Sequence, residues 1–219
     1  MPGYELIDRD ELKEISKIFK NGSIFYRYGF NKIRKNKFIV KSFENYFQRY
    51  VKSKYSLAVS SGTAALRVAL ASLGIKSGDQ VITQSFTFVA TVEAIVEAGA
   101  TPICTEIDNN LNMDITDLEK KITNKTKAII VVHMLGIPSY LDEIKRICKK
   151  KKIFLIEDTA WGLGAKYKGK MLGTHGDIGT YSFDFAKKIT TGEGGMVTFR
   201  KKEFYKKASA WHDHGHENN

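Results

Sequence analysis

The stretch Thr180-Tyr-Ser-Phe-Asp-Phe-Ala-Lys-Lys-Ile-Thr-Thr-Gly-Glu-Gly-Gly-Met-Val197 decides how we interpret the rest of the chain. Aromatic and polar side chains alternate from Tyr181 to Phe185, which is the period of a β-strand. Glycines then permit a turn, and the pair Lys187-Lys188 lies between the strand and this turn. A lysine on a rigid, largely apolar support loses hydration, so its pKa falls and its amine can form a Schiff base with an aldehyde. A solvated lysine pair beside a hairpin is the alternative interpretation.

Length and charge limit the classes of protein that this chain can represent. Its 219 residues, 42% of them hydrophobic, suffice for one α/β domain with a sizeable core. The 35 basic and 24 acidic residues give a net charge of +11, which would suit anionic partners such as nucleic acids or nucleotide-linked substrates. Because no basic stripe is interleaved with aromatic residues, we expect no nucleic-acid binding.

The cysteines and the hydropathy of the chain indicate in which cellular compartment the protein is expected. Cys104 and Cys148 each lie in an apolar segment without metal-ligand spacing, as expected for reduced core residues of a cytoplasmic protein. No apolar run approaches the roughly 18 residues of a membrane-spanning helix, and no signal peptide is visible. We therefore expect a cytoplasmic protein that does not bind membranes.

Strand-like and helix-like segments alternate along the chain, which predicts an α/β fold. Short apolar strands are expected at residues 56–59, 80–82, 101–107, 128–132 and 153–156. Helices are expected at residues 8–19, 43–51, 91–98, 114–121, 139–150 and 201–211. The second of these helices would place Phe43, Tyr46, Phe47 and Tyr50 on one face. Residues 162–179 are rich in glycine, and we expect irregular structure there.

Two polar groups follow predicted strands, where ligands gather in open parallel sheets. Ser60-Ser-Gly-Thr-Ala-Ala-Leu66 begins a helix, and its small side chains let the free N–H groups of the first turn approach an anion such as phosphate. An ordinary serine or threonine N-cap is the alternative. Glu157 and Asp158 follow the strand at 153–156, and a carboxylate buried there is costly without a partner.

Several separate motifs resemble those of the DegT/DnrJ/StrS-type sugar aminotransferases, which are fold type I enzymes that use pyridoxal phosphate (PLP). The first motif begins with Ser182-Phe183, has Lys187 after three further residues, and after one more residue continues as Ile189-Thr-Thr-Gly-Glu-Gly-Gly195. The other two motifs are Ser61-Gly-Thr-Ala-Ala-Leu66 and Glu157-Asp-Thr-Ala160. The resemblance runs from about residue 43 to residue 219. It implies a mostly parallel mixed sheet flanked by helices in three α/β/α layers.

The resemblance assigns a role to each expected site residue. Lys187, five residues after the serine of the signature, would carry PLP as a Schiff base, and Asp158 would pair with the protonated pyridine nitrogen. Phe88 would stack on the ring. The phosphate and its surroundings would be contacted by Gly62, Thr63, Ala64 and Ser182. Trp161 stands where most members carry glutamine or histidine, so the hydrogen bond to the ring oxygen is in doubt and the site is expected to have a different shape.

The resemblance implies transfer of an amino group from an amino acid, expected to be glutamate, to a keto-sugar, expected to be nucleotide-linked, in amino-sugar and polysaccharide biosynthesis. Lys187 favours amino transfer, because relatives with histidine in its place dehydrate their substrates. A non-catalytic regulatory member that binds PLP or a sugar nucleotide is the main alternative. A nucleotide-binding α/β domain is a third, although the chain has no Gly-x-Gly-x-x-Gly after a strand and no P-loop.

The resemblance also divides the chain. We expect an N-terminal arm at residues 1–30, a PLP-binding large domain at 31–200, and at 201–219 the start of a connection to a small C-terminal domain. Family members continue well beyond this length, so we expect the 219 residues to represent the large domain, inactive or poorly folded by itself. We expect the full-length protein to be a homodimer.

The remaining candidate residues receive other interpretations. We expect His133 and His175 to be structural. Three histidines between residues 212 and 216 lack a carboxylate or cysteine partner at a recognised distance, so we expect no metal site. Arg27, which lies among aromatic residues, is a candidate contact to an anionic substrate.

Overall fold

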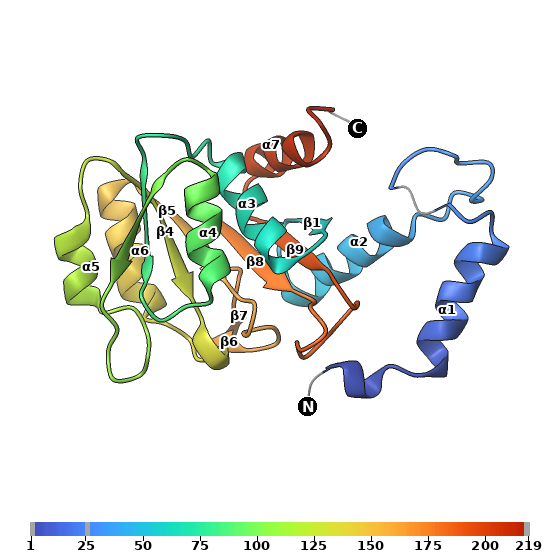
Figure 1. The fold of residues 1–219 in the computed structure, drawn as a ribbon, viewed down its shortest axis with the longest axis horizontal. Helices are drawn as coiled ribbons and strands as arrows, with labels where there is room; N and C mark the ends of the chain where they lie inside the picture. Colours follow the sequence, from blue (N-terminus) through green and yellow to red (C-terminus); the bar gives the residue numbers. More distant parts are fainter. Residues whose placement is uncertain (1–2, 25–26, 217–219) are drawn as a thin grey trace.

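The computed structural model describes residues 3–24 and 27–216, in which helices and strands alternate (Figure 1). The strands are β1 Tyr55–Val59, β2 Gln80–Gln84, β3 Thr101–Thr105, β4 Thr126–Val132, β5 Phe154–Asp158, β6 Lys166–Tyr167, β7 Lys170–Met171, β8 Ile178–Ser182 and β9 Gly195–Phe199. The α-helices are α1 Arg9–Lys20, α2 Ile39–Val51, α3 Gly62–Ser72, α4 Val89–Glu97, α5 Ile115–Lys121, α6 Leu141–Lys151 and α7 Lys202–His212. The short 3-10 helices are η1 Gly3–Leu6 and η2 Met134–Gly136.

Seven strands form one mixed sheet in the order β1-β9-β8-β5-β4-β2-β3. Neighbours from β8 to β3 pair in parallel. β9 runs antiparallel to both of its neighbours, β8 and β1, so β1 points in the same direction as β8. The carboxyl ends of β1, β5 and β8 therefore meet at one edge of the sheet, which is where ligands bind in open α/β sheets.

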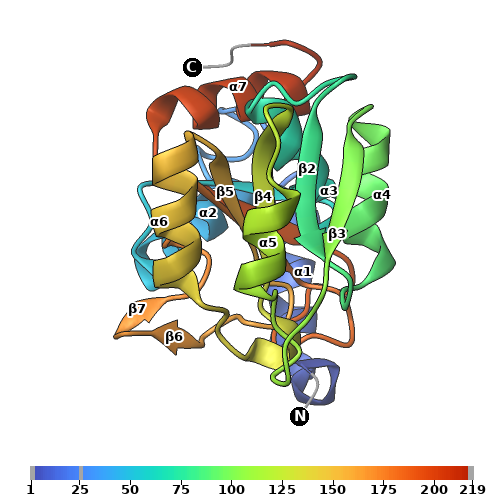
Figure 2. The ribbon, with the colours of Figure 1, turned by 90° about the vertical axis from the view of Figure 1, so that its left-hand side faces the viewer.

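Helices cover both faces of the sheet and complete three layers (Figure 2). One face carries α3, α4 and α7 over a core that includes Leu57, Ile130 and Val197. The other face carries α5 and α6 over Ile129 and Leu155, with α2 beside them. The faces separate in this way because successive strand residues point in opposite directions. The predicted three-layer, mostly parallel α/β fold is confirmed.

Helix α2 begins before the predicted start. Phe47 and Val51 are buried, whereas Tyr46 and Tyr50 are exposed. Phe43, Phe47 and Val51 recur every four residues and form one stripe against β8 and β9. Of the four aromatic residues predicted to share a face of this helix, Phe43 and Phe47 therefore pack on the sheet, and the two tyrosines lie at the flank of the stripe.

Strand β8 is shorter than the alternation of its side chains predicts. Its pairing with β9 ends at Ser182, and although Phe183 is still buried, Phe185 is 58% exposed. A turn replaces the strand because the Lys187 N–H donates to the Asp184 carbonyl. Lys187 therefore lies in the loop that follows the strand. The stretch expected to be irregular before β8 contains the small β6–β7 hairpin.

The two ends of the described chain differ in how they are packed. Asp8 caps α1 through a reciprocal pair of hydrogen bonds with Glu11, yet α1 has no buried residue and lies apart from the sheet (Figure 1). α7 packs Phe204 and Ala208 into the core beside α3. Phe25 and Tyr26, two of the aromatic residues beside Arg27 in the sequence, lie outside the described residues. No helix within the described ranges is long and apolar enough to cross a membrane.

Candidate functional site

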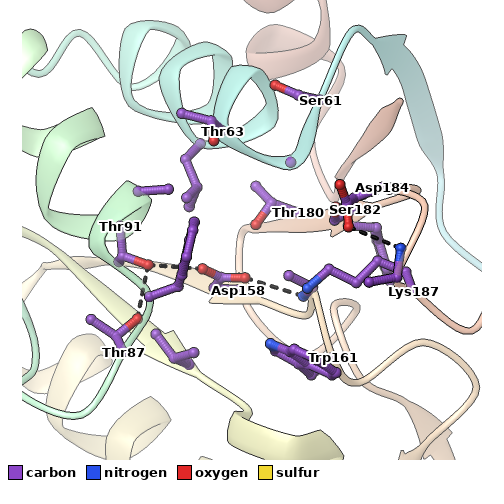
Figure 3. Close-up of a pocket in the computed structure, with 18 of the residues that line it drawn as sticks. Ser61, Thr63, Thr87, Thr91, Asp158, Trp161, Thr180, Ser182, Asp184 and Lys187 are labelled. Atoms are coloured by element: carbon purple, nitrogen blue, oxygen red, sulfur yellow. Dashed lines mark hydrogen bonds between the residues drawn. The ribbon is translucent and has the colours of Figure 1, made fainter. Parts of the chain in front are cut away.

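A cavity of about 340 Å³ lies at the sheet edge where β1, β5 and β8 end (Figure 3). The start of α3, the residues before and within α4, and the loop after β8 provide the rest of its wall. Seven of the predicted site residues line it: Gly62, Thr63, Phe88, Asp158, Trp161, Ser182 and Lys187. Ala64 does not line the cavity, and its N–H donates to Ser61 Oγ at 3.0 Å.

The start of α3 has the properties of an anion site. Ser61 caps the helix by accepting from the Ala64 N–H, while the N–H groups of Gly62 and Thr63 have no hydrogen-bond partner among the described residues. Gly62 packs closely on β8, since a Cβ added to it would lie 2.8 Å from the Cβ of Ser182. Free N–H groups, the helix dipole and a serine hydroxyl thus meet at one place, which suits a phosphate group.

Asp158 is a buried carboxylate at the end of β5 that faces the cavity (Figure 3). It accepts hydrogen bonds from Thr91 Oγ1 at 3.0 Å and from the Ala160 N–H at 3.1 Å. Thr91 is in turn 2.9 Å from the Thr87 hydroxyl. Burial raises the pKa of Asp158, although these two hydrogen bonds and the charge of Lys187 work against the rise. It has no ion pair within residues 3–24 and 27–216, so a protonated ligand nitrogen would compensate its burial.

Lys187 reaches the same cavity from the loop after β8, and its ammonium group lies 3.8 Å from the centre of the Trp161 ring (Figure 3). Burial lowers the pKa of Lys187, while the negative charges of Asp184 and Asp158 oppose this. Lys188 is exposed and does not line the cavity. Of the two adjacent lysines, Lys187 is thus placed to act as an amine in a partly dehydrated site.

Sequence reasoning missed Thr91, which orients the carboxylate of Asp158. Thr91 is 1% exposed and lies in the first turn of α4, a helix whose other buried residues are apolar. A lone hydroxyl at a buried helical position was the available signal, because buried polar groups need partners. Thr87 and Asp184 also line the cavity and were not predicted, whereas Ser61, which lines it too, belongs to the predicted phosphate-binding motif.

Other residues considered from the sequence lie outside this cavity. Arg27 forms an ion pair with the buried Glu44 and donates to the Ala58 carbonyl at 3.3 Å. His133 is buried, with Nε2 3.1 Å from a Glu157 carboxylate oxygen and Nδ1 accepting from the Ser139 N–H. The described part of the chain contains no group of three or more histidine, cysteine or carboxylate side chains placed to hold a metal ion.

Comparison with known proteins places the chain in a family. The profile of the DegT/DnrJ/EryC1/StrS aminotransferase family matches residues 26–219. The chain belongs to this family. It is 48% identical over 167 residues to a GDP-perosamine synthase of Escherichia coli O157:H7, a match that covers 76% of this chain and 46% of that protein. The family predicted from the motifs is confirmed.

Solved structures of aminotransferases have the same architecture. The aminotransferase of Psychrobacter cryohalolentis superposes with a TM-score of 0.88 at 36% identity, over 95% of this chain and 51% of that one. A putative sugar aminotransferase of Streptococcus pneumoniae, solved in its PLP form, gives a TM-score of 0.84 at 29% identity over 93% and 55%. The chain spans about half the length of the relatives it matches.

The residues of the cavity fit PLP, the cofactor of this family. The free N–H groups of Gly62 and Thr63 suit its phosphate, and the buried Asp158 suits its ring nitrogen. The half-buried amine of Lys187 suits its aldehyde. An acid, an amine and an anion site thus surround one cavity of suitable size.

Proposed function

We propose that the full-length protein is a PLP-dependent aminotransferase that transfers an amino group from glutamate to a keto-sugar in amino-sugar biosynthesis. The observation that supports this most is that Asp158 and Lys187 line one cavity beside the N–H groups of Gly62 and Thr63, which have no partner in the part of the chain that the structure describes. Family membership and the similarity to a GDP-perosamine synthase support the same conclusion.

Binding residues would hold the cofactor from three sides. The N–H groups of Gly62 and Thr63, with the hydroxyl of Ser182, would bind the phosphate. The ring of Phe88, which is 69% exposed at the start of α4, would cover one face of the pyridine. Trp161 would close the side of the site near Lys187, where its ring already lies.

Asp158 and Lys187 would perform the chemical roles. When bound, PLP supplies an electron sink for a carbanion. Asp158, held by Thr91 and the Ala160 N–H, would keep the ring nitrogen protonated. The Lys187 amine would remove the proton from the donor carbon and deliver it to the cofactor side, which requires the neutral amine that burial favours.

We propose further features of the full-length protein. A nucleotide-linked keto-sugar would suit the net charge of +11. A homodimer would cover Phe88, Leu135 and Ile189, which are apolar but exposed; light scattering after size exclusion tests this. We also keep the predicted cytoplasmic location and the division into an arm at 1–30, a PLP-binding domain at 31–200 and a connection from 201.

The test of the proposed function is chemical. The full-length protein with PLP should show an absorption band above 400 nm, and borohydride reduction followed by peptide mapping should place the cofactor on Lys187. Lys187→Ala should lose this adduct, whereas the control Lys188→Ala should keep it. Added glutamate should bleach the band. An adduct without any response to glutamate would favour the regulatory alternative, and an adduct on another lysine would contradict the proposal.

A further inference from the structure

The N-terminal segment η1 contacts the loop that carries Lys187, although the two are far apart in the sequence (Figure 1). The Gly3 N–H donates to the Lys187 carbonyl at 2.6 Å. One residue later, the ring of Tyr4 lies 5.7 Å from the ring of Phe185, which belongs to the same loop. A backbone contact and a ring contact thus join the same two segments.

Glycine is required at position 3 by space. A Cβ added to Gly3 would lie 2.8 Å from the Lys188 carbonyl oxygen and 2.9 Å from that of Lys187. Both atoms belong to the backbone, so no side-chain rotation could relieve the contact. Gly3 is buried, unlike the other residues of η1. Because glycine has no side chain, the two backbones can approach to hydrogen-bond distance.

The loop depends on such contacts because it has little regular structure of its own. Residues 183–194 contain neither helix nor strand. The N–H of Lys187 donates to Asp184 within the loop, and its carbonyl accepts from Gly3. The peptide group before Lys187 is therefore held by a hydrogen bond within the loop, and the peptide group after it by a hydrogen bond from η1.

We propose that Gly3 and Tyr4 are positioning residues for Lys187: η1 binds the backbone of its loop and thereby sets the direction in which the lysine side chain enters the cavity. The role of Lys187 rests on the proposed function, whereas the ordering of its loop by η1 does not. A lysine that must meet an aldehyde carbon depends on such orientation, since small displacements of a reacting group cost large factors in rate.

The rate of trypsin cleavage measures how well the loop is ordered, because trypsin cleaves after lysine and the loop contains Lys187 and Lys188. In the full-length protein without PLP, Gly3→Val should raise the rate of cleavage at these two sites about tenfold, as expected if a hydrogen bond and its packing are lost. Glu5→Val is the matched control, since it places the same side chain in η1 at an exposed position and should change the rate less than about twofold. Tyr4→Ala, which adds no bulk, should raise the rate about threefold.

The positioning of the amine needs a second measurement. On addition of PLP, the borohydride-trapped adduct on Lys187 should form about tenfold more slowly in Gly3→Val than in Glu5→Val, with equal melting temperatures for the two proteins. Absence of the adduct from the wild-type protein would overturn the proposed function. The cleavage rates would still show whether η1 orders the loop. Wild-type cleavage rates in Gly3→Val, or in Tyr4→Ala if Gly3→Val does not fold, would overturn the present proposal. Faster cleavage with an unchanged rate of adduct formation would overturn the positioning role.

Discussion

Thr91 contributes the side-chain hydroxyl that donates a hydrogen bond to the carboxylate of Asp158. Among the described residues, its hydroxyl is one of two hydrogen-bond donors to this buried carboxylate. Thr91→Val removes this donor while keeping the shape of the side chain. We expect PLP to bind about tenfold more weakly, because a hydrogen bond to a charged group contributes roughly 1.5–3 kcal/mol. Absorbance titration of the full-length protein with PLP measures this.

The control for this prediction is Thr87→Val. Thr87 contacts the Thr91 hydroxyl but not the carboxylate, so its loss should weaken binding by about threefold at most. Equal affinities of Thr91→Val and the wild-type protein would show that the carboxylate does not need the hydroxyl.

Trp161 bears on the protonation of the neighbouring amine. An indole ring whose centre lies 3.8 Å from the ammonium of Lys187 stabilises the charged form of the lysine. Trp161→Leu keeps an apolar wall but removes this attraction, so the pKa of Lys187 should fall further below its usual range. The rate of Lys187 acetylation as a function of pH, followed by mass spectrometry without PLP, should shift to lower pH. Trp161→Phe should shift less, and a shift to higher pH would contradict the cation–π interpretation.

For single residues, the sequence predicts which side chains could carry the chemistry better than it predicts which side chains contact one another. Lys187 and Asp158 could be chosen because they stand at the matching positions of motifs that resemble those of the family, and an amine and a carboxylate suit an aldehyde and a ring nitrogen. The contacts of Thr91 and Trp161 could not be predicted, because they depend on how α4 and the loop after β5 approach the strand ends. Ala64 belongs to the motif expected to bind the phosphate, but its N–H donates to the Ser61 hydroxyl that caps α3.

Among the elements, α3 and β8 together build the anion site. Gly62→Ala should push the helix start away from Ser182, because the added Cβ would lie 2.8 Å from the serine Cβ. We expect a loss of about 1–3 kcal/mol in the free energy of unfolding, the usual cost of overpacking. The protein should also lose most of its preference for pyridoxal phosphate over pyridoxal, which competition binding measures.

The control for the helix start is Gly169→Ala in the β6–β7 turn. Its φ of +79° makes alanine unfavourable, so stability should fall by about 1 kcal/mol, but nothing lies within 4 Å of the added Cβ. Its preference for the phosphorylated cofactor should equal that of the wild-type protein. If Gly62→Ala kept this preference, the close approach of α3 to Ser182 would not define the anion site.

Element positions followed from the sequence where local signals agreed, as at Asp8 before α1 and Asp114 before α5, both of which cap their helices. The ends of strands could not be predicted in this way where they depend on pairing with a neighbouring strand. β8 stops at Ser182 although its alternation continues. The Phe183 N–H still donates to the Gly194 carbonyl, but the Phe183 carbonyl accepts from the Thr191 N–H within the loop, so the ladder with β9 ends there. Whether Lys187 lies on a strand or in a loop therefore could not be predicted from the alternation.

For the whole molecule, Glu157 connects elements on the face of β5 opposite to Asp158. Its carboxylate accepts from His133 after β4 and from the N–H groups of Gly173, His175 and Gly176 before β8. Burial opposes its ionisation, but the hydrogen bonds from His133 and the backbone outweigh burial and lower its pKa. The two adjacent carboxylates thus have different roles: Glu157 joins β5 to the segments after β4 and before β8, and Asp158 faces the cavity.

The pH dependence of stability follows from this lowered pKa. A carboxyl group whose pKa is lower in the folded state than its ordinary 4.5 stabilises the fold fully above that value, and this contribution is lost as pH falls through the folded pKa. Glu157→Gln should therefore cost about 3 kcal/mol in urea unfolding at pH 7, as when one partner of a buried pair is removed, and less at pH 3. Glu143→Gln, on the exposed start of α6, should change stability by less than about 0.5 kcal/mol at either pH. An equal loss for Glu157→Gln at both pH values would mean that shape, and not the charge of this carboxylate, holds β4, β5 and the loop before β8 together.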